Sequence, residues 1–154
     1  MRFPALALVL LFGLSAQAQT SAPRCFGNGE AASPDGNFSA RVIRSGRTAC
    51  GESRIEIYSG DGHLLTIADY TSSDGNSGEG VIQLQWSPDS RFLVYSLSQP
   101  PGRPNGAYLI GVYSGGKNKV RTLPAARPDF AFTEDALEVT GGDGKPVRLP
   151  LAGP

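Results

Sequence analysis

Ser33-Pro34-Asp35-Gly36-Asn37-Phe38 precedes one apolar stretch of this 154-residue chain, and Trp86-Ser87-Pro88-Asp89-Ser90-Arg91-Phe92 precedes another. A degenerate third copy, Phe132-Thr133-Glu134-Asp135-Ala136-Leu137, lies near the C-terminus. Proline fixes φ at the second position of a tight turn, and the Asp side chain can accept hydrogen bonds from the amides that follow it. The motif is therefore typical of turns between antiparallel strands, and its recurrence predicts an all-β protein.

The 20 glycines and 12 prolines fall between apolar runs, a pattern typical of many short strands joined by turns. Arg54-Ile55-Glu56-Ile57-Tyr58 alternates between apolar and charged residues, and Ser59-Gly60-Asp61-Gly62 after it predicts a hairpin turn. Residues 91–97 are apolar enough for a central strand. The strands expected from these patterns cover residues 38–44, 54–58, 63–69, 81–86, 91–97, 108–113, 119–123, 130–132, 136–140 and 147–149.

The turn motif resembles the Ser-Pro-Asp-Gly hairpins of Tol-associated and WD40-like propellers. A propeller ring needs at least about four blades of ~40–50 residues, and three copies of the motif do not supply them. The same hydrophobic pattern fits a compact antiparallel β-sandwich, a twisted double sheet with propeller-like hairpins. That architecture is the predicted fold.

The N-terminus has the features of a cleavable signal peptide over residues 1–18. Arg2 supplies a positive charge, Ala5 to Leu14 is an apolar run too short to span a bilayer, and Ala16-Gln17-Ala18 fits the cleavage pattern. No cysteine follows the cleavage site directly, so no lipid anchor is expected. Residues 19–154 are then one all-β domain that is exported without membrane insertion, and the expected compartment is the periplasm.

Charge and cysteine content narrow the possible partners and cofactors. The chain has 14 Lys and Arg against 14 Asp and Glu, which argues against nucleic acid or an anionic membrane surface as the main partner. In an oxidising compartment the two cysteines, Cys25 and Cys50, predict a disulfide. Two free thiols or a shared metal site are the alternatives. No cofactor and no metal site are expected.

Catalytic motifs are weak in this sequence, and the protein is not predicted to be an enzyme. The only histidine, His63, opens a strand after a turn, and no Gly-x-Ser-x-Gly nucleophile elbow is present. Residues 71–80 are polar and glycine-rich, which predicts a mobile loop, with a calcium loop as the alternative. Glu52, Glu56 and Asp69 are interpreted as outward-facing strand charges, although a glycosidase needs only two such carboxylates close together.

The segment Ser98-Gln99-Pro100-Pro101-Gly102-Arg103-Pro104-Asn105-Gly106-Ala107-Tyr108 is the strongest candidate for a binding site. Its three prolines make it stiff, which lowers the entropy lost on docking. Arg103 and Tyr108 are residue types that carry binding energy at interfaces, and the Asn105 amide can reach into a cleft. The alternatives are an ordinary connection, and a Tyr108 ring that belongs to the core.

An exported all-β chain with a Trp-Ser-Pro-Asp turn and a Pro/Gly/Arg loop that ends in x-Gly-x-Tyr resembles the periplasmic inhibitors of invertebrate-type lysozyme. Several families of lysozyme inhibitor carry a Ser-Gly-x-Tyr motif whose Ser and Tyr enter the catalytic cleft and bond its acidic residues. Gly106 and Tyr108 match this motif, and Asn105 replaces its serine. The resemblance implies that Asn105 and Tyr108 donate hydrogen bonds to the carboxylates of a lysozyme, with Arg103 as a further contact.

The sequence thus leads to three hypotheses. The first is a periplasmic, non-catalytic lysozyme inhibitor with Arg103, Asn105, Gly106 and Tyr108 as partner-binding residues. The second is an envelope protein-binding module or a toxin-immunity protein on a partial propeller-like scaffold. The third is a carbohydrate hydrolase.

Overall fold

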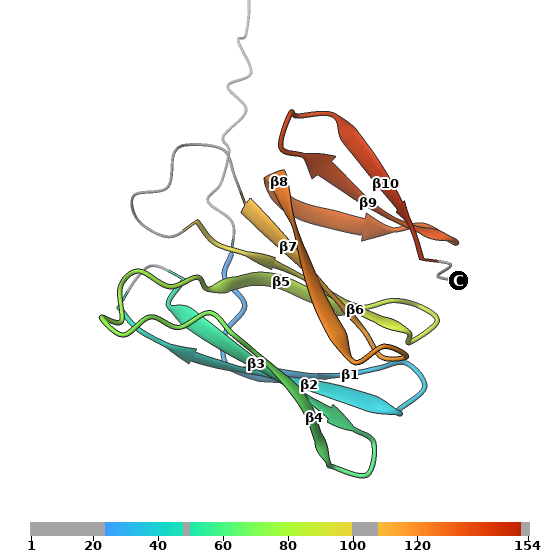
Figure 1. Ribbon diagram of the computed structural model, residues 1–154, viewed down its shortest axis with the longest axis horizontal. Helices are drawn as coiled ribbons and strands as arrows, with labels where there is room; N and C mark the ends of the chain where they lie inside the picture. Colours follow the sequence, from blue (N-terminus) through green and yellow to red (C-terminus); the bar gives the residue numbers. More distant parts are fainter. Residues whose placement is uncertain (1–23, 48–49, 100–107, 152–154) are drawn as a thin grey trace, which may run out of the picture.

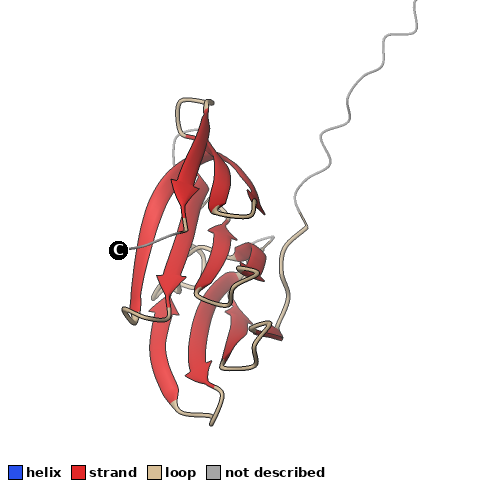
Figure 2. Ribbon diagram, turned by 90° about the vertical axis from the view of Figure 1, so that its right-hand side faces the viewer, coloured by secondary structure: helices blue, strands red, loops and turns tan. Residues whose placement is uncertain are grey.

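The structure, a computed structural model, describes residues 24–47, 50–99 and 108–151. Over these residues it contains strands and no helix, and the strands form two antiparallel sheets (Figures 1 and 2). One sheet has the order β1-β2-β3-β4 and the other β10-β9-β8-β7-β6-β5. The strands are β1 (Gly29–Ala32), β2 (Phe38–Ser45), β3 (Glu52–Ser59), β4 (Leu64–Asp69), β5 (Val81–Trp86), β6 (Phe92–Leu97), β7 (Tyr108–Ser114), β8 (Lys119–Phe132), β9 (Ala136–Gly141) and β10 (Pro146–Pro150). The prediction of an all-β fold with two packed antiparallel sheets is confirmed.

The recurring motif forms the same turn twice, between β1 and β2 and between β5 and β6. The Ser33 hydroxyl donates to Asp35 Oδ1 over 2.7 Å and accepts the Phe38 N–H over 3.0 Å. In the second copy, the Ser87 hydroxyl donates to an Asp89 oxygen over 2.6 Å and accepts the Phe92 N–H over 3.0 Å. In each turn the serine therefore hydrogen-bonds both to the aspartate and to a backbone N–H of the same turn. This is why the motif marks the boundary between two strands.

Two strand assignments differ from those expected. β1 falls in a segment where no strand is expected, and it forms by pairing with β2. β8 is one long strand, where two separate strands over 119–123 and 130–132 are expected. Its register shifts between Ala125 and Phe130, so Pro128 lies in an irregular stretch where its missing N–H costs no ladder bond.

The middle of the molecule is a layer made of β5, β6, β7 and the first half of β8, and both of its faces are covered (Figure 1). Side chains of β6 alternate between the two sides. Leu93, Tyr95 and Leu97 belong to a first core against the β1–β4 sheet, and Val94 belongs to a second core against β9, β10 and the second half of β8. Burial on both faces explains why β6 is apolar along nearly its whole length.

The chain folds into three successive units of antiparallel strands. The first strand of each unit lies beside the first strand of the next unit. The Trp86 indole N–H donates to the Ala31 carbonyl over 2.9 Å, which links β5 to β1. The Gln83 side-chain amide donates to the Phe130 carbonyl over 3.3 Å, which links β5 to the second half of β8. The units are β1–β4, the middle layer, and a C-terminal unit that consists of the second half of β8 with β9 and β10. The C-terminal unit has one strand fewer than the other two.

Candidate functional site

The candidate segment 98–108 connects β6 to β7, which are neighbouring strands in the interior of the six-stranded sheet. β6 ends at Leu97, which is fully buried and lies opposite Leu109 in the ladder. The Ser98 N–H donates to the Gly80 carbonyl over 2.7 Å, and the Ser98 hydroxyl accepts the Gly80 N–H over 2.7 Å. The entry to the segment is therefore fixed by two hydrogen bonds directly after a buried strand.

Tyr108 is the first residue of β7 and lies opposite Ala125 in the ladder. The sequence allows either an exposed Tyr108 ring or one that belongs to the core. In the structure the side chain is half-buried, between these two alternatives. Strand alternation places it on the same face as Ile110 and Val112, toward the second core. Arg103, Asn105 and Gly106 lie outside the described residues, so their placement relative to Tyr108 stays a prediction.

Cys25 and Cys50 form the predicted disulfide, with their Cα atoms 5.2 Å apart. The adjacent Phe26 N–H donates to the Val81 carbonyl over 2.9 Å. A Cβ atom on Gly80 would lie 2.6 Å from the Cys50 carbonyl oxygen, so only glycine fits there. The disulfide thus packs the start of the described chain against Gly80, the residue that also holds Ser98.

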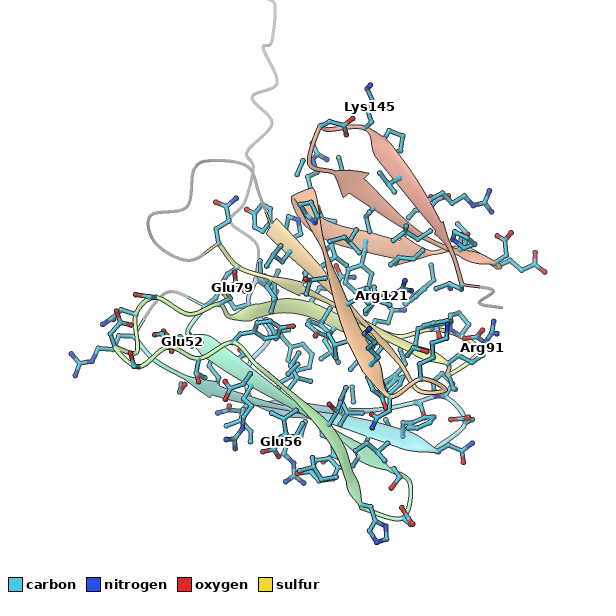
Figure 3. All side chains as sticks on the ribbon, in the orientation of Figure 1. Glu52, Glu56, Glu79, Arg91, Arg121 and Lys145 are labelled. Carbon is cyan, nitrogen blue, oxygen red and sulfur yellow. A yellow bond between two sulfur atoms is a disulfide. The ribbon has the colours of Figure 1, made fainter. Side chains whose placement is uncertain are left out.

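Glu52 corrects one prediction, because it is almost fully buried and not a solvent-facing charge. It lies on the face of β3 opposite Ile55 and Ile57, where the 71–80 loop covers it (its position is labelled in Figure 3). Its carboxylate accepts hydrogen bonds from the Ser72 N–H over 2.8 Å, the Ser72 hydroxyl over 2.5 Å and the Gly78 N–H over 2.7 Å. These bonds, that of the Ser72 hydroxyl first, lower the pKa of Glu52. Sequence reasoning missed this role because the donors lie 20 and 26 residues further along the chain.

Glu56 is the second carboxylate that is buried where an outward-facing charge is expected. It accepts the Tyr58 hydroxyl over 2.6 Å and pairs with Arg54 over 2.8 Å. Asp69, by contrast, is exposed as expected and accepts the N–H and hydroxyl of Thr71. Each of the three carboxylates therefore has hydrogen-bond or ion-pair partners in β3 or in the loop after β4, and these contacts give it a structural role.

Residues 71–80 form a loop, as predicted. The sequence predicts a mobile loop, whereas in the structure several hydrogen bonds within the loop hold its conformation. Asp74 accepts bonds from the Ser77 hydroxyl and from the amides of Asn76 and Ser77, and it shares the one proton of the Ser72 hydroxyl with Glu52. The Ser72 hydroxyl bond is the largest cause of the lowered pKa of Asp74. Among the described residues, no cluster of His, Cys, Asp and Glu is arranged to hold a metal ion.

His63 lies on an exposed hairpin between β3 and β4, and its Nδ1 is 2.9 Å from Asp61 Oδ2. The Ser59 hydroxyl donates to Asp61 itself. A catalytic triad needs the serine hydroxyl to donate to the imidazole, with the aspartate on the other side of the ring. Here the serine donates to the aspartate and not to the imidazole. This is the Ser–Asp contact that the Ser33 and Ser87 turns also contain.

No protein-family model matches this chain, and no curated protein matches its sequence. Over residues 24–47, 50–99 and 108–151, no helix is long and apolar enough to cross a membrane. The class of protein that these observations define is an all-β domain of two packed antiparallel sheets with one disulfide.

Proposed function

We propose that this protein is an exported, non-catalytic inhibitor of a lysozyme, and that segment 98–108 is its binding element. The observation that supports the proposal most is the anchorage of the two ends of this segment. Leu97 and Ser98 lie at the end of a buried strand beside Gly80, and Tyr108 begins the neighbouring strand. A binding segment with fixed ends loses less conformational entropy when it docks.

The proposed mechanism is occlusion of the substrate cleft. The Tyr108 hydroxyl and the Asn105 amide would donate hydrogen bonds to the catalytic carboxylates of the lysozyme, and Arg103 would add a charge-assisted bond. Gly106 would let the chain approach the cleft closely between them. A carboxylate held by such donors cannot act as the general acid that glycoside hydrolysis requires.

Export to an oxidising compartment belongs to the same proposal. The Cys25–Cys50 disulfide supports it, because disulfides persist in the periplasm and outside the cell. The apolar N-terminal run and the Ala16-Gln17-Ala18 cleavage pattern agree with it.

The test is to titrate the protein over residues 19–154 into invertebrate-type, chicken-type and goose-type lysozymes and to measure cell-wall hydrolysis. We expect inhibition of the invertebrate-type enzyme. Tyr108→Ala should weaken inhibition by about 2 kcal/mol, roughly 30-fold, if Tyr108 is a hot spot. Tyr108→Phe keeps the ring and removes only the hydroxyl, so the pair of variants separates the hydrogen bond from the packing. Melting temperatures report whether either variant perturbs the fold.

Failure to inhibit any of the three lysozymes would overturn the proposed function. Inhibition that Tyr108→Ala leaves unchanged would overturn the assignment of the binding segment. The hairpin-unit arrangement, with β1, β5 and the second half of β8 as neighbours, favours one second candidate, a propeller-like scaffold that binds another envelope protein. Capture of a partner from a periplasmic extract without lysozyme inhibition would favour that candidate.

A further inference from the structure

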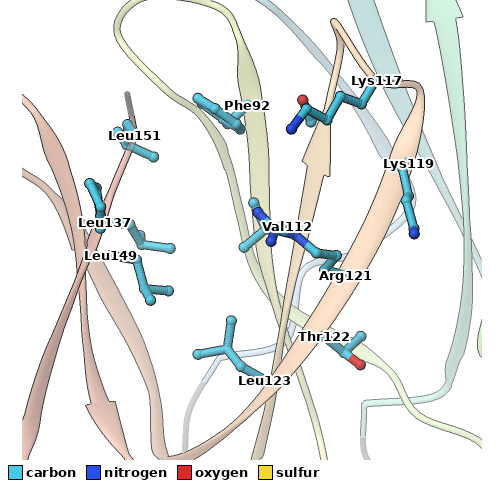
Figure 4. A pocket seen from close by; sticks show the side chains of 12 residues that line it. Phe92, Val112, Lys117, Lys119, Arg121, Thr122, Leu123, Leu137, Leu149 and Leu151 are labelled. Carbon is cyan, nitrogen blue, oxygen red and sulfur yellow. The ribbon is translucent and has the colours of Figure 1, made fainter. Parts of the chain in front are cut away.

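A groove of about 710 Å³ lies between the C-terminal unit and the middle layer, at the end of β7 opposite to Tyr108 (Figure 4). Its walls are apolar side chains from the two sides, Phe92, Val112 and Leu123 on one and Leu137, Leu149 and Leu151 on the other. This volume is within the range of about 300–1,000 Å³ that is usual for sites that bind small molecules. The groove lies over the first residues of β8, Lys119 to Leu123, where the C-terminal unit has no fourth strand to cover them.

Cations gather at one side of this groove. Lys117, Lys119 and Arg121 line it, and Figure 4 shows Lys117 and Arg121 extending toward the apolar side chains. No Asp or Glu is among the described residues that line it. Elsewhere in the described part of the chain, cations such as Arg91 and Arg148 have carboxylate partners, whereas these three have no ion pair there. The groove therefore combines apolar walls with uncompensated positive charge.

The edge of β10 beside the groove is unsuited to pairing with an added peptide strand. The Leu151 N–H donates to the Asp135 carbonyl, and the Lys145 carbonyl accepts the Gly141 N–H, so the odd-numbered residues of this hairpin pair with β9. The backbone of Pro146, Arg148 and Pro150 is then directed to the free edge. Two of these residues are prolines without an N–H, which is a device that protects edge strands from strand addition. A ligand that needs no backbone pairing fits this groove better than a peptide strand.

We propose that the groove binds a single-chain anionic amphiphile, with the acyl chain between the leucines and the acidic head group on Lys117 and Arg121. Apolar burial supplies the affinity for the chain, and charge-assisted hydrogen bonds to the head group supply the selectivity. The head group can be a carboxylate or a phosphate, since both accept from Lys and Arg. The site is separate from segment 98–108, so it stands or falls independently of lysozyme inhibition.

The experiment is isothermal titration calorimetry of the protein over residues 19–154 with sodium decanoate, decyl phosphate and uncharged monodecanoylglycerol, each below its micelle concentration. We expect the two anionic ligands to bind in a 1:1 complex and the uncharged one to bind at least about tenfold more weakly. The two anionic probes distinguish a carboxylate from a phosphate head group. Equal affinity for charged and uncharged ligands, or no binding of any of them, would overturn the proposal.

Matched variants locate the site. Lys117→Gln with Arg121→Gln should lower the affinity for decanoate about tenfold and leave that for monodecanoylglycerol unchanged, because both side chains are exposed and act only on the head group. Lys145→Gln with Arg148→Gln removes the same charge from the outside of the β9–β10 hairpin and should change neither. Leu149→Gln should weaken all ligands. Tighter binding of an acidic peptide with alternating leucines than of decanoate would overturn the choice of an amphiphile.

Discussion

The two faces of the middle layer are covered differently, although each face packs against an apolar core. The β1–β4 sheet covers one face with four strands, and the first core includes Trp86, Tyr95 and Tyr113, each buried. The C-terminal unit covers the other face, and its second core continues into a groove lined by half-buried side chains such as Leu123 and Leu149. The difference is one missing strand: the four-stranded sheet covers the first core, whereas the second core is left open at the groove.

Truncation of one leucine on each side measures this difference directly. Leu93 is fully buried in the first core, so Leu93→Ala should lower the free energy of unfolding by about 4 kcal/mol through lost burial and a cavity. Leu149 borders the groove and is half-buried, so Leu149→Ala should cost about 1 kcal/mol. Urea denaturation of the two variants gives both values. Equal losses would contradict the unequal covering.

A substitution that adds one methyl group tests the packing of the first core. A Cβ atom on Gly111 would lie 2.2 Å from the Tyr95 ring, and Tyr95 is fully buried, so the ring cannot move aside. Gly111→Ala should therefore destabilise the protein by about 3 kcal/mol. Gly116 has open space at the same atom, and Gly116→Ala is the matched control with an expected change below about 0.5 kcal/mol. A Gly111→Ala variant as stable as this control would show that the first core is loosely packed.

The smallest expected effect concerns the loop that joins the β1–β4 sheet to the middle layer. The pKa of Glu52 is lower in the folded protein than its ordinary value of 4.5, chiefly because the Ser72 hydroxyl donates to it. Its contribution to stability is therefore present above pH 4.5 and is lost as the pH falls through the folded-state pKa. Glu52→Gln should be less stable at neutral pH and should lose less stability than the wild type on acidification.

The measurement is the melting temperature of both proteins between about pH 7 and pH 3, a range that covers this titration. Glu138→Gln removes the same charge from an exposed position on β9 and controls for net charge. Parallel curves for wild type and Glu52→Gln would contradict the role assigned to Glu52.

The parts of the fold that local signals specify could be predicted from the sequence. The Ser-Pro-Asp turns, the alternation in β3 and the apolar run of β6 depend on neighbouring residues, and the structure confirms these strands. β1 could not be predicted, because Gly-Glu-Ala-Ala has little strand propensity and becomes a strand only by pairing with β2. The bend of β8 and the groove depend on which hairpins pack together, which no single stretch of sequence encodes.

The candidate site divides in the same way. The Cys25–Cys50 pair followed from export and cysteine count, and the structure confirms it. The burial of Glu52 could not be predicted, since its hydrogen-bond donors Ser72 and Gly78 are distant in sequence. The roles of Arg103, Asn105, Gly106 and Tyr108 in binding stay predictions, and only the inhibition experiment tests them.

Native-state amide hydrogen exchange tests the unequal covering of the middle layer most directly. The account predicts that amides of β2, β3 and β6 exchange only through global unfolding, whereas those of β9 and β10 exchange through a local opening of lower free energy. Adding decanoate should raise the free energy of the local opening of β9 and β10, and also that of global unfolding, because both openings destroy the groove. Protection of β9 and β10 equal to that of β6 in the free protein would contradict the account.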